Sequence, residues 1–299
     1  MWYISVLFLI LIVTAKSQHM VDDEYHISDP PSTIAILCTS IGKEFNKKSW
    51  VKAAISNHKE YSIKHGYTYI LRKIAQTNRH PEWEKIHMIQ QIFNQTTINN
   101  TNINSRNISN IELILWMDAD SIITNMNIKI ENIIRPSKDL VIVGDSMIAL
   151  SGNFIIRNSI WSIKALNDIW SMNITIGSGT DNAALISFLS GSKSYSSQRL
   201  LQYHYYAADI GWRQSFYKYK NIKGEGILGG LISPLHYKHV QMISKKSLCS
   251  FPPTYHYPGD FTEGDFILHV PAVSDSVRAQ WIERRGELQY ADLKPQCVL

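Results

Sequence analysis

The sequence predicts an α/β fold in which helices flank a mostly parallel central sheet. The first observation is that segments with strand patterns alternate with segments with helix patterns, which is typical of a doubly wound sheet. The second is a pair of carboxylates, Asp118 and Asp120, directly after an apolar strand segment, where such sheets bind ligands. The third is size and composition, because 299 residues, 44% of them hydrophobic, can bury a sizeable core.

The first half of the chain alternates regularly. Residues 32–40, STIAILCTS, form an apolar run of strand length. Residues 50–66 have apolar side chains at helical spacing and end at a glycine, as helix C-termini often do. Residues 67–73 are rich in β-formers, which predicts a second strand. Residues 81–95 begin with proline and read as a helix, and residues 111–117, IELILWM, as a third strand.

The second half is less regular. Residues 159–172 predict a strongly amphipathic helix with Ser159 as its N-cap. Residues 192–248 are rich in Tyr and Gly, have weak periodicity and are not assigned. The other expected elements are a short helix at 128–134, strands at 140–145, 153–158 and 264–270, a Gly/Ser turn and helix within 177–191, and a surface helix at 277–293.

The N-terminal residues predict a leader. The apolar run from Trp2 to Val13 is shorter than the roughly 20 residues of a membrane helix, and small residues at Ala15 and Ser17 follow it. We expect a signal peptide or short N-terminal anchor over 1–17, a polar linker over 18–31 and the folded domain over 32–299. The domain is then expected in the secretory pathway, with membrane association only through the N-terminal segment if it stays uncleaved.

Two further features bear on that location. Residues 94–110 are rich in Asn and are expected to form a surface loop. Cys249 and Cys297 could pair in an oxidising compartment, whereas Cys38, inside an apolar run, is expected to be a buried thiol. N-glycosylation sequons occur at Asn94, Asn99, Asn107 and Asn173.

Charge argues against nucleic acid as a partner. The formal net charge is +5, and no block of Lys and Arg follows the chain in the way that a nucleic-acid backbone requires. A mild positive charge suits an anionic substrate instead.

The stretch WMDADSIIT, residues 116–124, carries the strongest chemical signal. A buried strand tolerates two adjacent carboxylates only if a cation is present. Carboxylates at i and i+2 can both reach one Mg²⁺ or Mn²⁺ ion, which keeps other positions open for phosphate oxygens. A diphosphate leaving group needs such charge neutralisation. The same pattern also describes the aspartyl nucleophile of haloacid-dehalogenase-type phosphohydrolases, although their fold opens with that strand.

Six segments in order resemble glycosyltransferase family 34, which includes galactosyl-, mannosyl- and xylosyltransferases. They are HGYTYI (65–70), WEKI (83–86), WMDADSIITN (116–125), FIIRNSIWS (154–162), TDNAALISFL (180–189) and GDFILHV (264–270). The resemblance implies a GT-A (Rossmann-like) domain and a retaining, metal-dependent transferase. It would move a hexose or pentose from a UDP- or GDP-sugar to a glycan or glycoprotein hydroxyl, with Mn²⁺ or Mg²⁺, in the Golgi lumen or membrane or as a secreted protein.

The resemblance also assigns residues. Asp118 and Asp120 become ligands of the metal and diphosphate, and His269 the third metal ligand. Asp181 and Asn182 map to the pair that lines the sugar pocket and are the candidate catalytic residues. Lys85 and Arg278 map to cations near the donor, and Thr39 and Ser40 are placed near the nucleotide by fold analogy alone.

Each of these residues also has an ordinary structural explanation. His269 could cap a strand, Asp181 could be a helix N-cap, and Lys85 and Arg278 could be solvated charges on helices. The sequence departs from the family where Leu150 stands near an expected Asn, and where Ala272 and Val273 replace Gly and Cys. These departures keep open a non-catalytic, secreted glycan-binding module on the same scaffold.

Overall fold

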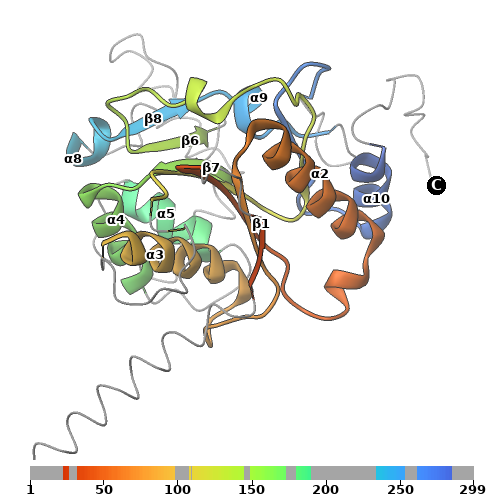
Figure 1. The fold of residues 1–299 in the computed structure, drawn as a ribbon, viewed down its shortest axis with the longest axis horizontal. Coiled ribbons are helices and arrows are strands. Elements are labelled where there is room, and N and C mark those ends of the chain that lie inside the picture. The colour runs from red at the N-terminus through yellow and green to blue at the C-terminus, as the bar shows by residue number, and fades with distance from the viewer. Residues whose placement is uncertain are drawn as a thin grey trace, which may run out of the picture.

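The computed structural model describes residues 23–26, 32–97, 108, 110–144, 149–172, 180–189, 234–252 and 261–284. Their core is a seven-stranded sheet in the order β1-β3-β2-β4-β7-β6-β8 (Figure 1). The strands are β1 (Asp23–His26), β2 (Ile34–Thr39), β3 (Thr68–Arg72), β4 (Leu113–Met117), β6 (Leu140–Gly144), β7 (Ala149–Arg157) and β8 (Val240–Ile243). A separate two-stranded sheet joins β5 (Ser121–Ile123) to β9 (Ile267–His269).

The predicted α/β class is confirmed, but the prediction of a mostly parallel sheet is wrong. The pairs β3–β2, β2–β4 and β6–β8 are parallel, whereas β1–β3, β4–β7 and β6–β7 are antiparallel. Only residues 145–148 separate β6 from β7, and so short a connection joins antiparallel strands, since a parallel crossover needs a dozen or more residues. The alternating sequence pattern therefore predicted the β2–β3–β4 half correctly and not the remainder.

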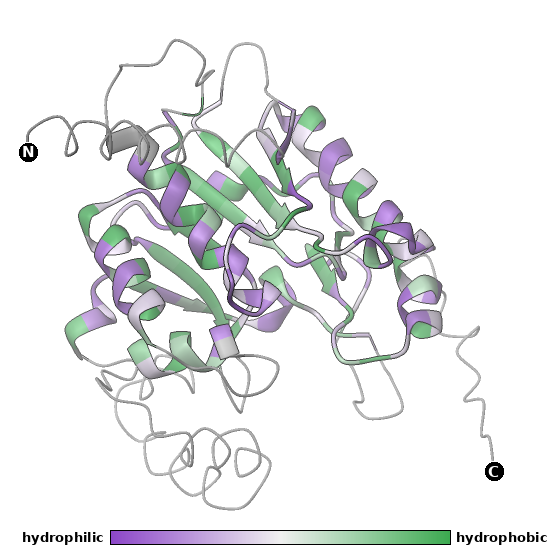
Figure 2. Ribbon diagram, turned by 90° about the horizontal axis from the view of Figure 1, so that it is seen from below, coloured by the Kyte–Doolittle hydropathy of each residue, from purple (hydrophilic) through white to green (hydrophobic). Residues whose placement is uncertain are grey.

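Helices cover both faces of the sheet. On one side lie α3 (Glu84–Thr97), α4 (Ile160–Ser171) and α5 (Thr180–Leu189), and on the other α2 (Ser49–His65) and α10 (Asp275–Glu283) (Figure 1). Figure 2 shows the strands as a mainly hydrophobic layer between helices of mixed character. The three helices α3, α4 and α5 share one hydrophobic cluster with strand residues such as Ile114 and Ile142. No helix in the described ranges is long and apolar enough to cross a membrane.

The residues at the helix termini explain where the helices begin and end. Ser159 accepts the backbone N–H of Ser162 at the start of α4, as the sequence predicts. Gly66 ends α2 in a left-handed conformation with φ 67°, which glycine adopts without strain. Pro81 opens a 3₁₀ turn, Pro81–Trp83, directly before α3. Other short elements are Phe45–Lys47, Ile130–Asn132, α8 (Pro234–Tyr237) and α9 (Lys245–Leu248).

Several predicted segments differ from the structure or lie partly outside the described residues. Asp23–His26, expected as linker, form edge strand β1, because Asp23 pairs with a buried arginine of β3 and not because of an apolar pattern. Residues 94–97 of the expected Asn-rich loop belong to α3, and within the rest of that tract only Ile108 and Asn110 are described. The leader over 1–17, the sequons at Asn99, Asn107 and Asn173, and Cys297 lie outside the described residues. Cys249 is a free, buried thiol, as is Cys38.

Helix α2 braces strand β5, which follows the carboxylate pair. Asn57 donates to the carbonyl of Ile123 at 2.9 Å and accepts the N–H of the same residue at 2.7 Å. His58 donates from Nε2 to the carbonyl of Ser121 at 2.8 Å, and within the described residues its Nδ1 has no hydrogen-bond partner. Both side chains are buried. The brace therefore fixes β5 and, through β5, its partner strand β9.

His58 should make the protein sensitive to acid. Burial lowers the pKa of His58 from 6.5 to about 4, because removal from water disfavours the charged form of the ring. The contribution of neutral His58 to the free energy of unfolding is fully present above about pH 6.5. It decreases by roughly 3 kcal/mol as the pH falls toward 4. Urea unfolding of wild type and His58→Gln between pH 7.5 and 4.5 should show a flatter pH dependence for the variant. Equal slopes would contradict a neutral buried His58.

Candidate active site

Asp118 and Asp120 lie directly beyond the carboxyl end of β4, in the turn that leads to β5. The backbone N–H of Asp118 donates to the carbonyl of Gly152 in the neighbouring strand at 2.9 Å. Its Oδ1 accepts the indole N–H of Trp116 at 2.8 Å. The two carboxylate oxygens of Asp120 face an imidazole and a guanidinium, which are described below. The apolar strand thus ends in two carboxylates held by specific donors.

His269 reaches this pair from the other end of the sequence. It is the last residue of β9, which pairs antiparallel with β5 so that His269 lies opposite Ser121. Its Nε2 is 3.2 Å from Oδ1 of Asp120, although 149 residues separate the two. Asp118, Asp120 and His269 each offer one ligand atom, and these atoms lie within 4.8 Å of one another. This set could hold one metal ion.

Lys85 links Asp118, of the candidate metal ligands, to Asp181. It lies in the first turn of α3 and is almost fully buried. Its Nζ is 3.2 Å from Oδ1 of Asp118, 2.8 Å from Oδ2 of Asp181 and 3.0 Å from the carbonyl oxygen of Ser151. Lys85 is therefore not a solvated surface charge, and it brings Asp118 and Asp181 to the same ammonium group.

A bulge in β7 supports both halves of the site. The register between β7 and β6 shifts at this point: Ile142 lies opposite Phe154, whereas the next residue, Val143, lies opposite Leu150. Residues 151–153 of β7 therefore have no partners in β6 and form a bulge. In this bulge Ser151 donates from Oγ to Asp181 at 2.9 Å, and its backbone N–H donates to Oδ1 of Asn182 at 2.8 Å. Asp181 and Asn182, in the first turn of α5, are thus held by side-chain contacts, and Asp181 is buried.

Arg278 also reaches the site, from α10. Its Nε is 3.5 Å from Oδ2 of Asp120 and donates to the carbonyl of Val270 at 3.2 Å. Thr39 and Ser40 lie at the end of β2, beside β4. The hydroxyl of Ser40 donates to Asn46, and no hydrogen bond joins either residue to the carboxylate pair in the part of the chain that the structure describes. Seven of the nine predicted residues are therefore linked by direct contacts. Thr39 and Ser40 lie at the end of β2, next to β4, where Leu37 is opposite Trp116, and their predicted role stays a prediction.

The charges of the site perturb one another. Burial alone would lower the pKa of Lys85, but Asp118 and Asp181 raise it above its usual value. Burial and the neighbouring Asp120 raise the pKa of Asp118, against the effect of Lys85. The pKa of Asp120 is lowered despite burial, because His269 and Arg278 stabilise its charge. At neutral pH Asp120 is thus a carboxylate that faces the imidazole of His269 and the guanidinium of Arg278.

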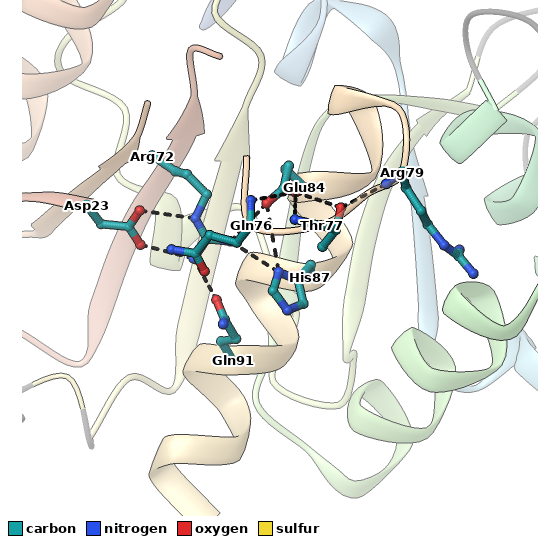
Figure 3. Close-up of polar contacts among 8 residues, drawn as sticks. All are labelled: Asp23, Arg72, Gln76, Thr77, Arg79, Glu84, His87 and Gln91. Atoms are coloured by element: carbon teal, nitrogen blue, oxygen red, sulfur yellow. Dashed lines mark hydrogen bonds and ion pairs between the residues drawn. The ribbon is translucent and has the colours of Figure 1, made fainter. Parts of the chain in front are cut away.

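A second buried ion network positions the start of α3. Arg72, at the end of β3, is fully buried and faces Asp23 on one side and Glu84 on the other (Figure 3). Glu84 in turn accepts from the backbone of Gln76 and Thr77 at 3.0 and 2.7 Å. Because Lys85 directly follows Glu84, this network fixes the helix turn from which Lys85 reaches the site.

The sequence did not single out Ser151, Gly152 or Cys249 as site residues. An isolated glycine inside an otherwise β-forming segment often marks a bulge or a close backbone approach, and this signal could have found Gly152. A Cβ at this position would lie 2.4 Å from Cε1 of His269. Neither Ser151 nor Cys249 carries any comparable signal.

Comparisons with known proteins give the following likenesses. A family model described as "Protein of unknown function, DUF273" matches residues 58–203, just under half of the chain. No curated protein matches. A glycosyltransferase involved in glycosylation of the major capsid of PBCV-1 is 15% identical with a TM-score of 0.49, over 84% of this chain and 98% of that one.

Two further solved structures are also glycosyltransferases. GlyE of Streptococcus pneumoniae TIGR4 is 13% identical with a TM-score of 0.36, over 86% of this chain and 61% of that one. A mutant of Drosophila β1,4-galactosyltransferase 7, in complex with manganese, UDP-Gal and xylobiose, is 11% identical with a TM-score of 0.34, over 54% and 63%. This chain spans less than two thirds of these two proteins. Likenesses of this size do not carry the chemistry of those enzymes to this chain.

Proposed function

We propose that this chain is a metal-dependent, retaining glycosyltransferase that moves a hexose or pentose from a nucleotide sugar to a glycan hydroxyl. The observation that carries the proposal is the convergence of Asp118, Asp120 and His269 from two distant segments, with ligand atoms within 4.8 Å of one another. A location in the secretory pathway belongs to the same proposal and is supported by the sequence of residues 1–17 alone.

The donor set fits a divalent metal with open positions. Two carboxylates and one imidazole supply both oxygen and nitrogen ligands. Such a mixed set suits Mn²⁺ better than it suits Mg²⁺ or Ca²⁺, whose sites typically contain oxygen ligands only. Three protein ligands leave other coordination positions for phosphate oxygens. When bound, the metal would neutralise charge on the departing diphosphate.

The other charged and polar residues of the site would bind the leaving group and the sugar. Arg278, beside Asp120, would face the anionic leaving group. Lys85 holds Asp181 and Asp118 at a fixed separation and balances their charge in a buried setting. Asp181 and Asn182 would face the sugar, with Ser151 orienting both, and Asp181 is the carboxylate to test as a nucleophile at the anomeric carbon.

The direct test is a donor screen. Purified protein should hydrolyse at least one nucleotide sugar in a panel of UDP- and GDP-sugars in the presence of Mn²⁺, and EDTA should stop the reaction. Calorimetry should show binding of UDP or GDP that requires Mn²⁺. A non-catalytic glycan-binding module would show neither, and a phosphohydrolase would release inorganic phosphate from simple phosphate esters. Absence of metal-dependent nucleotide binding would end the proposal.

A further inference from the structure

His269 has a second contact, on the side of the ring away from the carboxylates. Its Nδ1 lies 3.1 Å from Sγ of Cys249, while Nε2 faces Asp120 at 3.2 Å. Cys249 is fully buried and His269 is 6% exposed, so water does not compete for this contact. The imidazole therefore has one nitrogen turned to the candidate metal position and the other to a sulfur atom.

The backbone holds this sulfur in place. Cys249 follows α9, and its N–H donates to the carbonyl of Lys245 at 2.7 Å. The next residue, Ser250, bridges to β9: its N–H donates to Ile267 at 3.0 Å, and its carbonyl accepts the N–H of His269 at 2.8 Å. Cys249 and His269 thus lie on neighbouring backbone segments joined by two hydrogen bonds.

The rest of the ring is enclosed as well. The ring of Phe251 meets the imidazole edge to face, with centroids 5.7 Å apart. Gly152 lies against the ring, where no Cβ would fit. These contacts leave the imidazole little freedom to turn, so the identity of the Nδ1 partner decides which nitrogen carries a proton.

A metal-ligating histidine usually donates its other N–H to a carboxylate, a carbonyl or water, which fixes the tautomer and raises the basicity of the ligand nitrogen. Here the hydrogen-bond partner of Nδ1 among the described residues is Sγ of Cys249. A sulfur that accepts from Nδ1–H leaves the Nε2 lone pair for a metal, whereas a thiol that donates to Nδ1 would place the proton on Nε2 and block it.

We propose that Cys249 is a positioning residue for the metal centre: its buried Sγ accepts the Nδ1–H hydrogen bond of His269 and so keeps Nε2 directed at Asp118 and Asp120. The proposal rests on the proposed function in that it assigns His269 as a metal ligand. It names a sulfur atom in a role that carboxylates and carbonyls usually fill.

Cys249→Ala removes the acceptor, and Cys249→Ser keeps a shorter one. Cys38→Ala is the matched control, because Cys38 is also a free, fully buried thiol, and its Sγ contacts the carbonyl of Thr39 instead of His269 in the described part of the chain. Mn²⁺ affinity of the full chain, measured by calorimetry, should fall about 10- to 100-fold in Cys249→Ala and less in Cys249→Ser. Cys38→Ala should bind Mn²⁺ like wild type, even though both alanine variants lose a buried sulfur.

A second readout does not depend on metal or turnover. Histidine ¹⁵N spectra of the metal-free protein should show a protonated Nδ1 for His269 in wild type, and loss of that slowly exchanging proton in Cys249→Ala. Unchanged Mn²⁺ affinity and an unchanged Nδ1 signal in Cys249→Ala would overturn the proposal, as would finding Cys249 in a disulfide. If wild type binds no metal, the proposed function fails, while the Nδ1 signal still decides whether Cys249 orients the ring.

Discussion

Replacing Asp120 with alanine should abolish Mn²⁺-dependent transfer while leaving the fold intact. Among the described residues, Asp120 is the carboxylate that contacts both His269, at 3.2 Å, and Arg278, at 3.5 Å. Its loss removes a proposed metal ligand and the carboxylate that His269 and Arg278 both contact. Because a metal's stabilisation of a leaving group is worth several kcal/mol, turnover should fall about a thousandfold or more.

The measurement is turnover of the best donor from the screen, together with Mn²⁺ affinity and urea unfolding. Asp120→Asn keeps the shape of the side chain without its charge and should also lose activity. Asp275→Ala is the matched control, since Asp275 is an exposed carboxylate that also contacts Arg278, through a 3.7 Å ion pair, yet is not a candidate ligand. Full turnover in Asp120→Ala would mean that the acidic pair does not bind the metal of the reaction.

The parts of the fold that the sequence predicted are those with a strong apolar signal. The strand over 111–117 became β4 because five consecutive apolar residues can be buried on both faces of a central strand. β1, with the sequence DEYH, has no such pattern and is held by the Asp23–Arg72 ion pair, which only the folded structure brings together. β5 has three residues, fewer than any periodicity can reveal, and α2 side chains fix it in place.

The same contrast holds at the site. Asp118 and Asp120 were identified because two carboxylates after an apolar strand are chemically unusual. His269 was a candidate only through resemblance, because its distance from the pair along the sequence carries no spatial information. Ser151 and Gly152 lie at the register shift in β7, and Cys249 contacts His269 from the segment after α9. Of these three residues only Gly152 has a signal in the sequence, an isolated glycine in a β-forming segment.

Gly152→Ala is expected to be the most damaging substitution that changes no charged or polar group. The added Cβ would lie 2.4 Å from Cε1, 3.0 Å from Nδ1 and 3.1 Å from Nε2 of His269. Packed atoms do not approach so closely, so either the ring or the bulge must move. The ring is held by Cys249 and by the pairing of β9, and the Gly152 carbonyl accepts from Asp118, so either movement separates the ligands. Mn²⁺ affinity should therefore fall at least about 100-fold.

Gly66→Ala separates this effect from a loss of stability. Gly66 has φ 67°, and no atom would lie within 4 Å of an added Cβ, so alanine there costs about 1 kcal/mol of backbone strain far from any steric conflict. That variant should unfold at lower urea concentration yet bind Mn²⁺ normally. Gly152→Ala should show the opposite balance, with a large loss of Mn²⁺ affinity at urea concentrations where it is still folded. If both glycine variants bound Mn²⁺ like wild type, the close approach of Gly152 to His269 would have no part in shaping a metal site, because a displaced imidazole cannot remain a ligand.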